Sequence, residues 1–199
     1  MWPAATSGTA VDSAARPGRS SRIGLANALS SARLLLSAAM PWLLFQGGPF
    51  PLIIWGLAVA SDYLDGPVAR RRNEVSLAGA VLDNVADVTF VLGGLSAAAA
   101  LGLVSWIVPA SIGLSAGAYA VASARPRREP ALARSRLGHW AGVLNFLCLG
   151  VVTASMACPD ERWRVVLGAA AFVTACINLG AVGSRLAAAV RRRVASRTS

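Results

Sequence analysis

The sequence predicts an all-α integral membrane protein, a bundle of six transmembrane helices. Hydrophobic residues make up 55% of the 199 residues and charged residues only 14%, whereas soluble domains typically carry about 25% charged residues. Four long runs contain no Asp, Glu, Lys or Arg: 34–61, 88–124, 137–159 and 165–184. A helix needs about 20 apolar residues to cross a bilayer, and the second run is long enough for two helices joined by a tight turn.

The elements follow in order along the chain. Residues 1–20 are rich in Ala, Ser, Gly, Thr and Pro and lack the apolar core of a signal peptide, so we expect a flexible N-terminal tail. The membrane domain is expected over 21–190, with a short surface helix over 19–31, and residues 191–199 should form a basic C-terminal tail. The expected spans are 27–46, 51–72, 77–101, 104–123, 137–157 and a sixth that ends near 189.

Turn and charge signals separate these spans. A Gly-Gly-Pro sequence at 47–49 closes the first span, and a turn near 102–105 divides the third from the fourth. The basic segment 125–136 separates the fourth span from the fifth. Asp160 and Glu161 open the sixth, because acidic side chains favour the N-terminus of a helix.

The arginines indicate how the chain is oriented. All 19 basic residues are arginine, and the formal net charge is +10. With six spans, 17 of the 19 fall at the two chain ends and in the loops after the second and fourth spans, all on one side of the membrane. This is the positive-inside pattern, which places those parts in the cytoplasm. It leaves no soluble basic face, so we expect no nucleic-acid partner.

Four aspartates gather in one window of 26 positions, although the chain has only nine acidic residues. Asp62 and Asp65 are three residues apart. Asp83 and Asp87 are four apart, so each pair shares one face of its helix. The segment between the pairs is long enough for a turn, so the two faces can oppose one another in a cage of four carboxylates.

Such a cage needs a compensating cation. An aspartate at the centre of a spanning helix costs about 2.5–3.5 kcal/mol, and repulsion among the four adds to that cost. Arginines 70–72 could neutralise part of the charge, but they lie beyond the helix end, where they favour water and lipid phosphate. All-oxygen ligands favour Mg²⁺, Mn²⁺ or Ca²⁺, and two such ions would cancel four negative charges.

The residues around the aspartates form a longer pattern, D-x-x-D-G-x-x-A-R, eight residues, then G-x-x-x-D-x-x-x-D. This pattern resembles the signature of the CDP-alcohol phosphatidyltransferase (phosphotransferase) family. Asn27, Ser30 and Arg33 resemble the family's N-x-x-[ST]-x-x-R element, which precedes its first span. The motifs cover 27–87, and the six-span layout extends the likeness to 27–190.

The resemblance implies a membrane transferase of phospholipid biosynthesis that acts on CDP-diacylglycerol and releases CMP. Its cofactors would be two divalent cations, Mg²⁺ or Mn²⁺. The metal ligands that it implies are Asp62, Asp65, Asp83 and Asp87. Asp87 would also be the catalytic base that deprotonates the acceptor alcohol. The residues implied to bind the CDP group are Gly66, Ala69, Arg70, Gly79, Asn27 and Ser30.

The acceptor is less closely specified. Size and layout most resemble phosphatidylglycerophosphate synthase, so glycerol 3-phosphate is the expected acceptor. Arg134 and Arg136 resemble a basic acceptor-phosphate element, although positive-inside charge explains them equally well. Inositol phosphate, serine or phosphatidylglycerol are alternative acceptors, and a non-enzymatic ion-coupled transporter is an alternative function. We expect a bacterial inner (cell) membrane protein with the active site in the cytoplasm and, since the family often forms homodimers, a second copy as partner.

Overall fold

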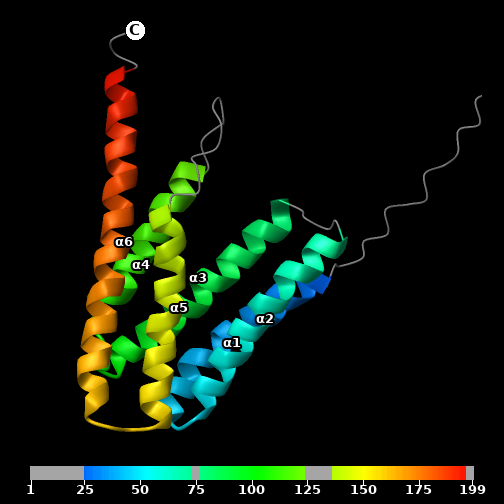
Figure 1. The fold of residues 1–199 in the computed structure, drawn as a ribbon, viewed down its shortest axis with the longest axis vertical. Coiled ribbons are helices and arrows are strands. Elements are labelled where there is room, and N and C mark those ends of the chain that lie inside the picture. The colour runs from blue at the N-terminus through cyan, green and yellow to red at the C-terminus, as the bar shows by residue number, and fades with distance from the viewer. Residues whose placement is uncertain (1–24, 73–76, 124–135, 196–199) are drawn as a thin grey trace, which may run out of the picture.

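The computed structural model describes residues 25–72, 77–123 and 136–195, with side chains described over 34–61, 84–121 and 137–191 and at Val194. These parts of the chain form six helices and no strand (Figure 1). The helices are α1 (Leu25–Gln46), α2 (Phe50–Arg72), α3 (Leu77–Ala100), α4 (Ile107–Ser123), α5 (Arg136–Ala157) and α6 (Arg162–Ala195). The predicted all-α class is confirmed.

Two helix boundaries differ from the prediction. Residues 25–31, predicted to end a short surface helix, belong instead to the continuous α1. Residues 19–24 of that predicted helix lie outside the described residues. Helix α6 extends past the predicted end near 189 to Ala195. No Gly or Pro follows Gly183 within it, and Ala and Arg are both good helix formers, so nothing in the sequence stops the helix at the membrane boundary.

Among the residues that the structure describes, two helices are long and apolar enough to cross a membrane: Leu137–Ala157, of 21 residues, and Arg162–Arg191, of 30 residues. Within the residues described, the other four helices contain shorter apolar stretches, namely Leu34–Gln46, Phe50–Ser61, Asn84–Ala100 and Ile107–Val121. The described parts of the chain therefore contain the predicted number of helices, while their assignment as six transmembrane spans stays a prediction.

The helices form two groups. Helix α1 packs against α3 and α2, and α6 packs against α5 and α4. Helix α5 joins the groups, since it also contacts α2 and α3. In Figure 1, α1, α2 and α3 slant in one direction, whereas α5 and α6 stand nearly upright. The start of α1, the end of α2 and the start of α3 lie at one end of the bundle (Figure 1).

The predicted turns lie at the opposite end. Gly47 and Gly48 have φ angles of 76° and 80°, and Gly102 has a φ of 73°, in the left-handed region that glycine tolerates. The Leu103 N–H donates to the Ala98 carbonyl at 2.9 Å, which closes the end of α3. The predicted helix start at Asp160 is confirmed, because its Oδ1 accepts the Arg162 N–H at 2.8 Å.

The core lies where α1, α3 and α5 meet. Met40 and Leu44 of α1, Phe90 and Leu95 of α3 and Leu149 of α5 have no exposed surface. The ring of Phe90 also stacks on that of Phe146, with centroids 5.9 Å apart. This apolar packing fixes α3 against α1 and α5 below the positions of the aspartates.

A buried amide pair links α5 to α6. The Asn178 side chain is 1% exposed. Its Nδ2 donates to Asn145 Oδ1 at 2.7 Å and to the Thr174 carbonyl at 2.9 Å. Polar side chains that pair between helices in this way contribute modestly to helix association in lipid.

We therefore expect a measurable coupling between the two asparagines. In a double-mutant cycle of Asn145→Ala and Asn178→Ala, the coupling free energy of unfolding should be about 0.6 kcal/mol and at most ~1.7 kcal/mol. Urea unfolding in detergent micelles measures it. Asn84→Ala, which truncates an exposed asparagine, is the control and should leave stability unchanged. A coupling of zero would mean that the amide pair does not hold α5 to α6.

Candidate active site

The two aspartate pairs lie on two helices that are consecutive in the chain. Asp62 and Asp65 belong to the second half of α2, and Asp83 and Asp87 to the first half of α3. Only four residues connect Arg72 to Leu77, so both pairs lie toward the same end of the bundle (Figure 1). Each helix is continuous through its pair, so the spacing of three or four residues puts the two positions of each pair on one side of the helix.

Among the four aspartates, Asp87 is the one whose side chain the structure describes. It is half-buried. Asn84 and Val85, just before it, are exposed, whereas Ala86 and Phe90 are fully buried. Thr89, two residues after it, is exposed again, so Asp87 lies at the boundary between the buried and the exposed faces of α3. Apolar surroundings screen charge less than water does, so partial burial strengthens the electrostatic interactions of a carboxylate.

The metal site stays a prediction. Among the side chains that the structure describes, no group of three or more His, Cys, Asp or Glu comes together. The side chains of Asp62, Asp65 and Asp83 lie outside that part of the chain. The donor set itself suits a hard divalent cation, because four carboxylates supply only oxygen ligands, which Mg²⁺ and Mn²⁺ prefer.

The residues predicted to bind the CDP group are distributed over three helices that pack together. Helix α1 contacts both α2 and α3. The backbone places the residues as follows: Asn27 and Ser30 on α1, Gly66, Ala69 and Arg70 on α2, and Gly79 on α3. Their side chains lie outside the described residues, so their roles remain predictions. Their helices do bring them to the same end of the bundle as the aspartates (Figure 1).

The predicted acceptor-phosphate residues are only partly placed. Arg136 is the first residue of α5, with its side chain undescribed, and Arg134 lies outside the described residues. Sequence reasoning missed Arg185, which is half-buried on α6. Its Nη1 donates to the Ser115 carbonyl at 2.7 Å and contacts Ser115 Oγ at 3.3 Å. Its guanidinium carbon lies 5.5 Å from the centroid of the Tyr119 ring, within the range of a cation–π contact.

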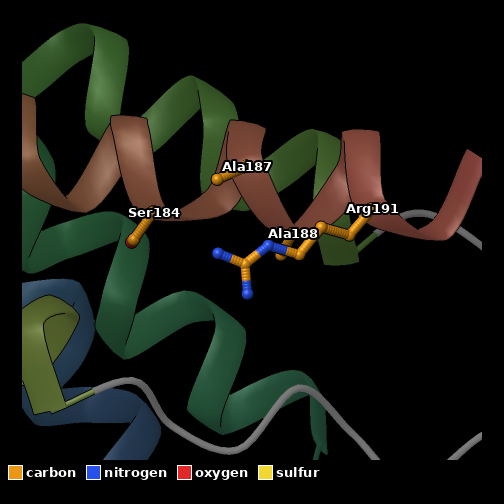
Figure 2. A pocket seen from close by; sticks show the side chains of 4 residues that line it. All are labelled: Ser184, Ala187, Ala188 and Arg191. Carbon is orange, nitrogen blue, oxygen red and sulfur yellow. The ribbon is translucent and has the colours of Figure 1, made fainter. Parts of the chain in front are cut away.

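A shallow groove opens on α6 beyond Arg185. It has a volume of about 480 Å³ and is lined by Ser184, Ala187, Ala188 and Arg191. Figure 2 shows the Arg191 side chain reaching back along α6 toward Ser184. One signal could have singled out Arg185 in the sequence. It stands six residues before the cluster 191–193, inside the otherwise apolar sixth segment.

The fold and these residues define a class of protein, an apolar helical bundle with acidic pairs on two consecutive helices that both pack against α1. The chain belongs to the CDP-alcohol phosphatidyltransferase family, whose model matches residues 23–179. That match contains the whole signature, so the family predicted from the motifs is confirmed. Apolar helices and membership of this family together indicate a membrane protein.

One curated relative matches a shorter stretch. Over 76 residues the chain is 41% identical to the cardiolipin synthase (CMP-forming) of Streptomyces coelicolor (strain ATCC BAA-471 / A3(2) / M145). The matched stretch covers 35% of this chain and 35% of that protein.

Proposed function

We propose that this protein transfers a phosphatidyl group from CDP-diacylglycerol to an alcohol acceptor whose glycerol carries a phosphate, with release of CMP. The observation that carries the proposal is the placement of the complete aspartate signature on consecutive helices, α2 and α3, at one end of the bundle. The family match over residues 23–179 supports it.

In the proposed reaction, the acceptor hydroxyl oxygen bonds to the phosphorus that carries diacylglycerol. The bond from that phosphorus to the bridging oxygen breaks, and CMP leaves with the electron pair. Asp62, Asp65, Asp83 and Asp87 would hold two divalent ions, Mg²⁺ or Mn²⁺. These ions, when bound, would neutralise charge on the diphosphate and on the leaving CMP. Asp87, half-buried at the edge of the core, would take the proton from the hydroxyl.

The CDP group would lie against the small residues of the signature. Glycine lacks a Cβ, so a flat nucleobase can approach the helix backbone closely at Gly66 and Gly79. Ala69 adds little bulk beside them, and Arg70, Asn27 and Ser30 supply polar groups. This proposal places the cytidine between the ends of α1, α2 and α3.

The acceptor phosphate would be bound by arginines. The two contacts of Arg185 Nη1 engage only part of a guanidinium that has five N–H donors, and guanidinium groups suit phosphate geometry. Arg136, the first residue of α5, and Arg134, two positions before it in the chain, are the other arginines proposed to bind the acceptor phosphate. Arg191 lines the groove six residues further along α6.

Two acceptors meet these requirements. The overall layout favours glycerol 3-phosphate. Two features favour phosphatidylglycerol, which would yield cardiolipin. The matched relative is a CMP-forming cardiolipin synthase. In addition, Asn84 and Val88 occupy positions where the glycerol-3-phosphate branch of the family usually has Pro and Lys.

In the membrane, we propose six spans formed by α1 to α6. The termini and the aspartate end would face the cytoplasm of a bacterial cell, because that side carries 17 of the 19 arginines. A second copy of the chain is the proposed protein partner.

An acceptor panel tests the proposal. Protein purified in detergent micelles is incubated with CDP-diacylglycerol, Mg²⁺ and one acceptor at a time: glycerol 3-phosphate, phosphatidylglycerol, inositol phosphate or serine. Mass spectrometry identifies the lipid product, and CMP release gives the rate. We expect product from one of the two glycerol acceptors. CMP release that no acceptor stimulates would contradict the proposal, and ion flux in liposomes without any product would favour the transporter alternative.

A further inference from the structure

Trp55 of α2 is fitted closely to α5. Its indole Nε1 donates to the Phe146 carbonyl at 2.9 Å. A Cβ added to Gly150 would lie 2.6 Å from Trp55 Cζ2, 2.8 Å from Cε2 and 3.1 Å from Cη2. The benzene part of the indole therefore rests directly on the backbone of α5 at Gly150, a contact that no side chain at position 150 could preserve.

The neighbouring residue of α5 makes an equally close contact with α3. A Cβ added to Gly94 would lie 2.8 Å and 3.0 Å from the two Cδ atoms of Leu149. Leu149 itself has no exposed surface. Two adjacent residues, Leu149 and Gly150, thus contact both helices that carry the aspartates.

The residues of α2 and α3 that contact α5 lie a fixed number of residues from the aspartates. Trp55 precedes Asp62 by seven residues, and Gly94 follows Asp87 by seven. Seven residues are two helical turns, about 10 Å along the axis and within about 20° of the same face. The fully buried Ala58 precedes Asp65 by the same seven residues. The helix faces that meet α5 therefore continue, two turns on, to the positions of both aspartate pairs.

We propose that Trp55, Gly94, Leu149 and Gly150 are positioning residues, which set the spacing of α2 and α3 and thereby the affinity of the aspartates for divalent cations. The inference rests on the proposed function, since it concerns the same four carboxylates. Outer-shell residues that hydrogen-bond metal ligands typically change affinity or activity by about 10–100-fold, and we expect an effect near the lower bound from residues that act through the position of a helix. A displacement of one helix by about 1 Å is enough to misplace a ligand side chain.

Mn²⁺ binding is the decisive readout. The full chain, purified in detergent without lipid substrate, is titrated with Mn²⁺ while electron paramagnetic resonance reports the free ion. Gly150→Ala should weaken Mn²⁺ binding by about 10-fold or more, because the new methyl group displaces the indole and with it α2. Trp55→Phe, which keeps a ring but loses the hydrogen bond, should weaken binding less and covers the case in which Gly150→Ala does not fold.

Matched controls separate positioning from general packing. Gly56→Ala on α2 and Gly142→Ala on α5 add the same methyl group where nothing lies within 4 Å, and they should bind Mn²⁺ like the unaltered chain. Adding Trp55→Phe to Gly150→Ala removes part of the ring that collides with the methyl group, so it should recover part of the lost affinity. In folded Gly150→Ala a merely structural role predicts no loss of Mn²⁺ affinity, and therefore nothing for Trp55→Phe to recover.

The outcomes distinguish this inference from the proposed function. Unchanged Mn²⁺ affinity in folded Gly150→Ala or in Trp55→Phe would overturn the positioning role alone, if the unaltered chain binds Mn²⁺ and releases CMP. A chain that binds no Mn²⁺, or whose Mn²⁺ binding survives Asp62→Asn, would overturn the proposed metal site and the positioning role with it.

Discussion

Replacing Asp87 by asparagine is expected to lower CMP release from CDP-diacylglycerol by about 10³-fold, because the change removes both a general base and a metal ligand. A positioned base alone contributes about 10²–10⁴-fold. An amide cannot accept the proton of the acceptor hydroxyl, and it carries no charge to hold a cation. The rate of CMP release at saturating acceptor measures the loss.

Asp160→Asn is the matched control for this substitution. It makes the same carboxylate-to-amide change, but Asp160 caps the start of α6 at the other end of the bundle. Asparagine is also an effective helix cap, so this variant should keep full activity. Equal activity in Asp87→Asn and Asp160→Asn would exclude Asp87 from the reaction.

Removing divalent cations should stop the reaction almost completely. Metal ions that neutralise a diphosphate and its leaving group contribute several kcal/mol to the transition state, which corresponds to about 10³-fold in rate. We expect EDTA to reduce CMP release by that factor, and excess Mg²⁺ or Mn²⁺ to restore it. Assays of CMP release before chelation, after chelation and after metal addition measure the effect.

Two controls accompany the chelation experiment. Circular dichroism should show unchanged helix content in EDTA, since the apolar packing of α1, α3 and α5 does not involve the aspartates. Ca²⁺ alone tests whether charge is sufficient, because it accepts looser geometry than Mg²⁺. A rate in EDTA equal to the rate in Mg²⁺ would refute metal-assisted transfer.

The helices could be predicted because their signals are local. Runs without charged residues predict the number of helices. The Gly-Gly-Pro sequence at 47–49 and Gly102 predict two turns, which the structure confirms. The predicted end of α6 near 189 is too early, because the residues beyond 189 are more polar but still favour a helix. A membrane boundary and a helix end are separate properties, and only the first follows from hydropathy.

The candidate site could be predicted only in part, for a related reason. Residues three or four apart share a helical face whatever the fold, so the pairing of Asp83 with Asp87 follows from spacing alone. The contacts of Trp55 with Phe146 and of Arg185 with Ser115 join residues 91 and 70 positions apart. They depend on how helices rotate against one another, which no local pattern specifies.

The most direct test of the proposed site is the number of Mn²⁺ ions bound per chain and their magnetic coupling. Two ions held about 3.5–4 Å apart should give a spin-coupled spectrum. That spectrum should disappear in Asp62→Asn on α2 and equally in Asp83→Asn on α3, because both helices supply ligands. If either variant still binds two coupled ions, the four carboxylates do not share a metal site, and the proposed mechanism is wrong.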